Sequence, residues 1–302
     1  MTAGSRKDRR RTGFIALCTL PTAVLYLVLF IFPFIYAFYL SLFRWKGYSL
    51  DNMIYCGTRN FRQLFQDPII LQGLKNNLFF MLWSTVVIFL LAMLFAICLT
   101  RLKQIRFPNF FRVIYFFPNV LSVIVVGVLW SFIYNPNFGL LNGVLRTFGL
   151  ESWICDWLGD ENTVMGSLVA PQSWTHIGFY MVLFIAAIQN IPEEYYESAV
   201  IDGANEMRQT LSITFPLIWG TIRMAIVFFV INAFVKTFAL VYVVTGGGPN
   251  HASELLTTYM YNKAFKYSDF GYGAAIGVFL FVIVAIISLG ALKLTERDTI
   301  EY

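Results

Sequence analysis

The chain has 302 residues, of which 58% are hydrophobic, 18% are aromatic and only 13% are charged, with a formal net charge of +5. A soluble domain carries about 45–50% apolar and about 25% charged residues, so the composition excludes an ordinary soluble fold and an intrinsically disordered chain. Four cysteines and two histidines exclude a disulfide scaffold and give no metal-binding cluster. What remains is a protein that crosses a membrane several times, whose positive charge indicates loops facing anionic lipid rather than binding of nucleic acid.

Six long apolar runs follow one another along the chain, and each reaches the ~20 residues that a helix needs to cross a bilayer. We therefore expect an all-α, polytopic fold with a transmembrane domain at 14–294 and tails at 1–13 and 295–302. The expected spans are about 14–42, 76–100, 111–134, 164–190, 216–246 and 272–294.

The first run is longer than one crossing requires. It contains Pro21 and Pro33, which favour a kink. A cleaved secretory signal is the alternative for this basic, then apolar, N-terminus. The run is too long for a signal, however, and no small-residue cleavage site follows it.

Charges in the connecting loops predict the orientation of the spans. The N-terminal tail is basic, and the loop after the second run carries Arg101, Lys103, Arg106 and Arg112 without an acid. The loop after the third run is acidic. Because short cytoplasmic loops are rich in Lys and Arg, we place both termini, the 101–112 loop and the 191–215 loop in the cytoplasm. The basic loop at 43–75 departs from this rule.

The energy source for any transport must lie outside this chain. All 17 Asp and Glu lie outside the six apolar runs, so the usual parts of an intramembrane proton relay are missing. The phosphate-binding pattern GxxxxGK[ST] is also absent. A pump built on this chain therefore needs another subunit to supply its energy.

The segment from Ile191 to Trp219 is the most informative part of the chain. Glu193 and Glu194 lie in the first turn of an expected helix, where negative charge complements the helix dipole. Gly203 permits a tight bend, and Asp202 can cap the short helix that follows.

Ala199 and Gly203 are four residues apart, so we expect them to share a face on which small side chains let another surface approach closely. The alternative for this segment is an amphipathic helix lying on the membrane. Such helices favour Lys and Arg on the polar face, whereas acids dominate here.

These residues resemble the EAA loop of ABC-importer permeases, whose pattern is approximately EAAxxDGAxxxxxxxxIxLP. Glu197-Ser198-Ala199 matches EAA, Asp202-Gly203-Ala204 matches DGA, and Ile213 and Pro216 match the later Ile and Pro. The departures are mild: Ser198 replaces the middle Ala, Phe215 replaces the Leu before Pro, and Thr210 stands where an aromatic residue is frequent.

A second motif narrows the resemblance to carbohydrate-type, maltose-like permeases. Thr245 and the following Gly246, Gly247, Gly248 and Pro249 resemble the TGGGP loop of one of the two permease partners. This loop is either a tight external turn that needs glycine or a surface facing the binding protein or the external gate. Further positions fit the third and fourth spans of that family: Phe111, Arg112, Pro118, Trp130, Asn142, Trp174, Gly178 and Phe179.

The resemblance, which covers about residues 14–294, implies a partnership. In this family two permease subunits form the pathway, two ATPase subunits use ATP and Mg on the cytoplasmic side, and an extracytoplasmic sugar-binding protein delivers the solute. The chain is then a permease subunit of a bacterial or archaeal cytoplasmic membrane, with no catalytic residue or cofactor of its own and a homologous permease as partner. Its coupling helix, between spans four and five, contacts the ATPase through Glu197, Ala199, Asp202, Gly203 and Ala204.

Five residues are candidates for the substrate pathway. Candidates are Asn232, Lys236, Trp130, Tyr134 and Trp174. Asn232 and Lys236 are four apart on one face of span five, where a charge is costly unless it faces a cavity or a partner. Lys236 could instead extend to the outer surface, Trp and Tyr also anchor membrane interfaces, and the partner permease could carry the site.

The expected solute is a mono- or oligosaccharide, with glycerol phosphate as the alternative. A membrane enzyme is the competing class. It would need acid, base or nucleophilic groups gathered at one site, but the acids here are dispersed through the loops.

Overall fold

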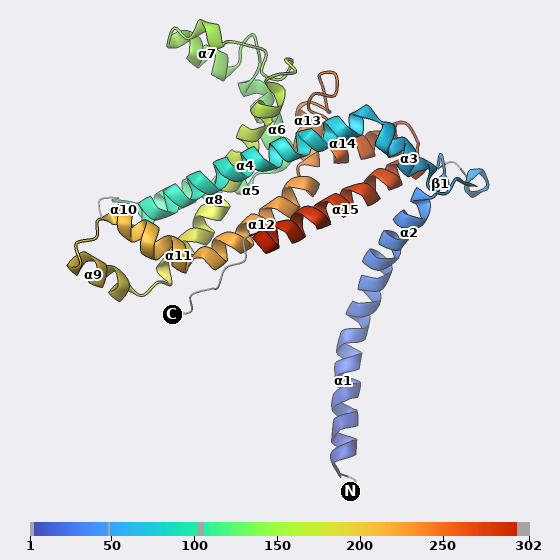
Figure 1. Cartoon of the computed structure of the whole chain (residues 1–302), viewed down its shortest axis with the longest axis horizontal. Coiled ribbons are helices and arrows are strands. Elements are labelled where there is room, and N and C mark those ends of the chain that lie inside the picture. Colours follow the sequence, from blue (N-terminus) through green and yellow to red (C-terminus); the bar gives the residue numbers. More distant parts are fainter. Residues whose placement is uncertain (1–2, 48, 102–105, 295–302) are drawn as a thin grey trace. The chain divides into compact units, whose positions relative to one another are not determined.

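The computed structural model describes residues 3–47, 49–101 and 106–294, and most of these residues are helical (Figure 1). They form two units. The first comprises the described residues up to Gln66 together with Met260–Phe279, and the second comprises Asp67–Tyr259 and the described residues from Leu280 onward. The tail expected at 1–13 is helical from Ala3, whereas the tail expected at 295–302 lies outside the described residues.

The first unit begins with an uninterrupted helical run. It consists of α1 (Ala3–Tyr26), a π-helical turn at Leu27–Ile31 and α2 (Phe32–Ser41). Leu17–Ser41 is long and apolar enough to cross a membrane. The expected disturbance of this run takes the form of the π-helical turn. That turn lies just before Pro33, which has no N–H to donate to the preceding turn.

A small β-hairpin, held by side-chain hydrogen bonds, follows in the region that we expected only as a basic loop. Strand β1 (Phe43–Arg44) pairs antiparallel with β2 (Ile54–Tyr55), and a 3-10 turn lies between them. Helix α3 (Arg59–Gln66) then supplies Asn60, whose Nδ2 donates to the carbonyls of Ser41 and Phe43 at 2.8 and 2.9 Å. These bonds fix the hairpin to the end of α2.

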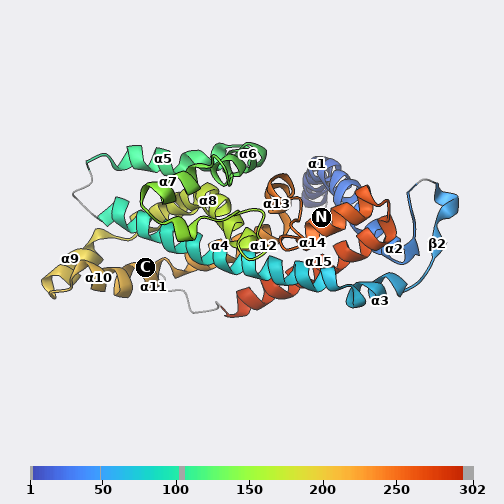
Figure 2. The ribbon, with the colours of Figure 1, turned by 90° about the horizontal axis from the view of Figure 1, so that it is seen from above.

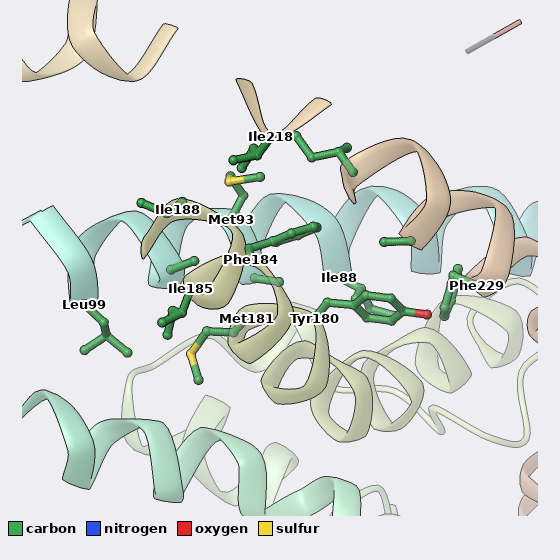
Figure 3. Packing of buried hydrophobic residues seen from close by; sticks show 14 of the residues in the cluster. Ile88, Met93, Leu99, Tyr180, Met181, Phe184, Ile185, Ile188, Ile218 and Phe229 are labelled. Atoms are coloured by element: carbon green, nitrogen blue, oxygen red, sulfur yellow. The ribbon is translucent and has the colours of Figure 1, made fainter. Parts of the chain in front are cut away.

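The second unit is built around two long helices that lie side by side, α4 (Pro68–Arg101) and α8 (Val164–Gln189) (Figure 1). Helix α5 (Pro108–Val120) packs on α8 (Figure 2), and α12 (Trp219–Val235) packs on α4. Leu, Ile, Met and aromatic side chains fill the space between them (Figure 3). This core includes Ile88, Ala92, Met93, Ala96, Tyr180, Met181, Phe184, Ile185, Ile188, Ile218 and Phe229.

A second apolar cluster joins the other elements of this unit. It lies where α6 (Val123–Ile133) packs on α13 (Phe238–Val244), and it includes Phe80, Val126, Val164, Leu168, Leu240, Val241 and Leu255. Helix α7 (Leu140–Thr147) and a 3-10 turn at Glu151–Trp153 also belong to this unit. Helices α14 (Leu256–Tyr261) and α15 (Phe270–Leu294) each have residues in both units, and the π-helical turn at Asn262–Lys266 lies in the first.

Among the described residues, four helices are long and apolar enough to cross a membrane, or up to six if each of two bent pairs is one span. The bent pairs correct our expectation of continuous helices at 111–134 and 216–246. In the first, α5 and α6 meet at 99°, because Leu121 and Ser122 are extended after Pro118 removes a donor from the last turn of α5.

The second bent pair joins Glu206–Leu217 to Trp219–Val235 at 67°. In addition, α12 ends at Val235, and α13 begins again only at Phe238. The region expected as one fifth span is therefore made of three helical pieces.

Candidate functional site

Helices α9 (Glu193–Ile201) and α10 (Glu206–Gln209) lie near the C-terminal end of α4 (Figures 1 and 2). A π-helical turn at Thr210–Thr214 joins α10 to α11 (Phe215–Leu217) and so to α12. Residues 191–215, which connect α8 to α12 along the chain, therefore form two short helices with a turn between them. We call these residues the α9–α10 segment.

Gly203 closes the turn between the two helices, with a φ of +74°. Its N–H donates to the Val200 carbonyl at 3.0 Å, and the Ala204 N–H donates to the Ala199 carbonyl at 2.8 Å, which together make a Schellman motif. A Cβ at Gly203 would meet open space, so glycine is required here for its backbone conformation and not for its size. The expected face shared by Ala199 and Gly203 is wrong, because Gly203 lies beyond the helix end.

Asn205, and not Asp202, caps α10. The Asn205 Oδ1 accepts the backbone N–H of Arg208 at 2.9 Å, which satisfies one of the free donors of the first turn. Our assignment of the cap to Asp202 is therefore wrong. Helix α9 ends at Ile201, and Asp202 lies between it and the left-handed turn at Gly203, so Asp202 is exposed and too early in the chain to cap α10.

Buried polar groups anchor the segment to its surroundings, and sequence analysis missed them. The Tyr196 hydroxyl of α9 lies 3.0 Å from Thr214 Oγ1, and both side chains are buried. The Gln209 Nε2 donates to the Ala204 carbonyl at 2.9 Å. Tyr196 lies among acidic residues in a stretch without clear periodicity. An aromatic ring beside exposed carboxylates is the only local signal that could have identified it as a buried anchor.

The outer surface of the segment is unusually apolar for a loop. Ile201 is 86% exposed, and Val200, Met207 and Leu211 are also exposed. Glu197 lies exposed on the same short helix as Val200 and Ile201. Large apolar side chains gathered on an exposed projection indicate a surface that contacts another protein or the membrane.

A cavity of about 470 Å³ brings together two of the predicted pathway residues, Asn232 and Lys236. Both lie at the end of α12, where the Lys236 N–H donates to the Asn232 carbonyl at 2.7 Å. The wall also includes polar side chains from α5 and α8: Asn119, Gln172, Thr175 and His176. Amides, a ring nitrogen and an ammonium group can hydrogen-bond hydroxyl or acidic oxygens of a solute.

The three predicted aromatic residues do not line this cavity. Trp130 lies 5.3 Å from Tyr134 and 6.1 Å from Trp174 between ring centroids, so the three form one cluster. Tyr134 is buried and donates its hydroxyl to the Ser167 carbonyl at 2.9 Å. Trp130 and Trp174 pack on the apolar cluster around α6 and α13. The arrangement gives these rings a packing role.

The glycine-rich loop after α13 needs glycine at two positions. Gly246 and Gly247 have φ values of +62° and +95°, and the Gly248–Pro249 peptide bond is cis. A Cβ at Gly247 would lie 2.6 Å from Oε2 of the buried Glu254, so a side chain here would also displace that carboxylate.

Two buried asparagines of α4 fix the continuation of this loop. The Asn76 Nδ2 donates to the carbonyls of Ala252 and Glu254, both at 2.9 Å, and the Asn77 Oδ1 accepts the Leu256 N–H at 2.9 Å. Sequence analysis gave neither residue a role. A buried polar pair at the start of an apolar run is the signal that could have found them.

We expect Asn76→Leu to lower the free energy of unfolding by about 2–4 kcal/mol, because two buried carbonyls lose their donor. Thermal unfolding of the purified chain in detergent measures this effect. Asn162→Leu is the control. Asn162 is exposed near the same loop, and its substitution should change stability by no more than about 0.5 kcal/mol. Equal unfolding temperatures for both variants would contradict the anchoring role of Asn76.

Comparison with known proteins adds a family and a fold. Residues 92–299 match the family described as "Binding-protein-dependent transport system inner membrane component". "Probable ABC transporter permease protein YurN" of Bacillus subtilis is 36% identical over 90% of this chain and 92% of its own length. "Diacetylchitobiose uptake system permease protein NgcF" of Streptomyces coelicolor is 35% identical over 94% of this chain and 84% of its own length.

A further relative is "sn-glycerol-3-phosphate transport system permease protein UgpA" of Agrobacterium fabrum. It is 33% identical over 92% of both chains. Among solved structures, a chain of a bacterial ABC transporter involved in the import of the acidic polysaccharide alginate has a TM-score of 0.84. That chain is 23% identical, and the match covers 97% of this chain and 99% of that one, so the likeness shows a shared fold.

Proposed function

Because the chain belongs to the family of binding-protein-dependent transport system inner membrane components, we propose that it forms one half of the solute pathway of an ATP-driven importer. It is a multi-pass membrane permease and not an enzyme, and we assign ATP and Mg to separate ATPase subunits. The proposed complex contains this chain, a second homologous permease, two ATPase subunits and an extracytoplasmic binding protein. We place it in a bacterial or archaeal cytoplasmic membrane.

The α9–α10 segment carries this proposal. It projects between two long helices, ends in an exposed apolar surface and keeps a fixed left-handed turn at Gly203. We propose that it docks on an ATPase subunit through the surface formed by Glu197, Ala199, Asp202, Gly203 and Ala204. Closure of the ATPase pair then moves the docked segment. Transport requires that the segment make different contacts in the inward-open and outward-open states.

We propose a mono- or oligosaccharide as the solute. Relatives named for diacetylchitobiose uptake and for arabinooligosaccharide transport support this class. Relatives named for glycerol-3-phosphate transport, together with Lys236 at the cavity, support glycerol phosphate as the second candidate. In both cases the cavity that contains Asn232 and Lys236 is this chain's contribution to the pathway.

We expect Asn232→Leu to raise the KM of uptake about ten-fold, because one hydrogen-bonding group is lost from the cavity. Uptake of labelled solute into proteoliposomes that contain the full complex measures this. Trp130→Phe keeps an aromatic ring in the packing cluster and should leave the KM unchanged. Lys236→Met distinguishes the two solute classes, because it should abolish binding of a phosphate ester and only weaken binding of a neutral sugar. An unchanged KM in Asn232→Leu would contradict the assignment of the cavity.

Affinity purification of the tagged chain from its native host in mild detergent tests the proposed complex. We expect mass spectrometry to identify an ATPase subunit and a second, similar permease. The ATPase activity of that complex can then be screened with sugars, glycerol phosphate and the binding protein. Recovery of a stable, monodisperse chain alone would contradict the proposal and favour a solitary transporter or a membrane enzyme.

A further inference from the structure

Arg101 is the last residue of α4, and its guanidinium contacts both helices of the α9–α10 segment. Its Cζ lies 3.6 Å from the centroid of the Tyr196 ring on α9, and its Nη2 donates to Gln209 Oε1 of α10 at 2.8 Å. We infer that Arg101 is a positioning residue that clamps the segment to α4. The clamp itself stands on these contacts, whereas its consequence for transport rests on the proposed function.

Each partner of Arg101 holds a second part of the segment. The Tyr196 hydroxyl lies 3.0 Å from Thr214 Oγ1, in the turn that leads to α11 and α12. The Gln209 Nε2 donates to the carbonyl of Ala204, directly after the left-handed turn. Tyr196 and Gln209 are each 5% exposed, so packing restricts both to the geometry that meets the guanidinium. One cation therefore connects α4 to α9, to α10 and to the turn between them.

The chemistry of this site requires arginine. Among the described residues, no carboxylate lies within 4.0 Å of the Arg101 guanidinium. Its charge faces a ring and an amide oxygen, and it lies at the C-terminal end of α4, where the helix dipole favours a cation. A planar guanidinium can stack on the Tyr196 ring and donate in its own plane at the same time. A lysine ammonium keeps the charge but cannot do both.

The requirement for arginine distinguishes the clamp from a simpler role of Arg101 as a positive charge. In the sequence, Arg101 is one of several basic residues that orient a cytoplasmic loop, and lysine serves that purpose equally well. Arg101→Lys therefore preserves the orientation of the chain in the membrane and removes only the stacking and the directed hydrogen bond.

The clamp affects which helices move together with the α9–α10 segment. Its covalent connections lead to α8 through residues 190–192 and to α12 through α11. The Tyr196 side chain also packs in the apolar core that contains Leu99 of α4, and Arg101 adds a directed polar contact to this packing. Helix α4 in turn packs along both α8 and α12. In the proposed importer, displacement of the segment by the ATPase is then delivered to three long helices together.

Hydrogen exchange of the full chain in lipid nanodiscs tests the clamp directly. We expect Arg101→Lys to raise amide exchange about ten-fold across residues 195–214, because a cation–π contact and a charged hydrogen bond are lost. Exchange in the α4–α8 core, measured around Ile88 and Phe184, should stay as in the wild type and shows that the variant is folded. The matched control is Arg106→Lys, an exposed residue of the same basic loop, which should change neither region.

A second variant keeps the test decisive if Arg101→Lys proves unstable. Gln209→Ala removes one arm of the clamp and should raise exchange around Ala204 and α10 while the amides near Tyr196 remain protected. Wild-type exchange across 195–214 in both variants would overturn the inference.

The purified complex shows the functional consequence. We expect Arg101→Lys to retain its ATPase subunits and to transport several-fold less solute per ATP hydrolysed, with the ratio unchanged in Arg106→Lys. If wild-type chain retains no ATPase, the proposed function fails while the exchange result still decides on the clamp. If the ATPase is retained and both exchange and the transport ratio are unchanged in Arg101→Lys, the clamp fails and the proposed function stands.

Discussion

Gly178→Ala should prevent α5 from packing on α8. A Cβ at Gly178 would lie 2.6 Å from Phe116 Cα and closer still to the Tyr115 carbonyl oxygen. These are backbone atoms of α5, so relief requires a shift of the whole helix and not of one side chain. We expect the free energy of unfolding to fall by about 3 kcal/mol. Thermal unfolding in detergent and the amount of folded chain in membranes both measure this loss.

Gly166→Ala is the matched control, because it makes the same substitution on the same helix. A Cβ at Gly166 meets no atom within 4 Å, and the residue is exposed. Replacing glycine by alanine inside a helix should then stabilise the chain by about 0.5–1 kcal/mol. If Gly178→Ala unfolds at the same temperature as Gly166→Ala, the close packing of α5 on α8 is wrong.

Gly203→Val should abolish most uptake while the chain remains inserted in the membrane. The φ of +74° at Gly203 is costly for any residue with a Cβ, by about 1–2 kcal/mol, and more for a β-branched residue. The left-handed turn is then lost, and with it the bonds that end α9. We expect the uptake rate, normalised to the amount of chain in the membrane, to fall at least about ten-fold.

Gly203→Asn separates backbone conformation from side-chain size at this position. Asparagine tolerates the left-handed region, so this variant should keep most of the uptake. If asparagine is as harmful as valine, a partner surface excludes side chains at Gly203, as the expected small-residue face implied. Wild-type uptake by Gly203→Val would show that transport does not depend on the turn at all.

The sequence predicted the helices best where an apolar run is bounded by polar residues. The expected 164–190 and 272–294 compare with Val164–Gln189 and Phe270–Leu294. The break at Leu121–Ser122 lies within a run that we expected to be one span; Pro118 and Asn119 just before it are a local signal that mean hydropathy over the run does not reveal. After the break at Val235, α13 packs on α6, and that contact is not visible from local sequence.

In the candidate site, too, the sequence predicted local features and missed those that depend on tertiary packing. The motif located the α9–α10 segment, since its residues are adjacent in the chain. The rule that residues four apart share a helix face failed at Gly203, because the helix ends before it. Arg101 and Gln209 are 108 positions apart, so their hydrogen bond depends on tertiary packing that no local pattern predicts.

Site-specific photo-crosslinking from Ile201 in native membranes tests directly whether the α9–α10 segment docks on an ATPase subunit. This residue is 86% exposed on the apolar surface of the α9–α10 segment. A crosslinker at Phe148, exposed on the loop after α6 and α7, provides the control. We expect an adduct with an ATPase subunit from position 201 and none from position 148. Adducts with lipid alone from position 201, or equal capture of the ATPase from both positions, would contradict coupling through this segment.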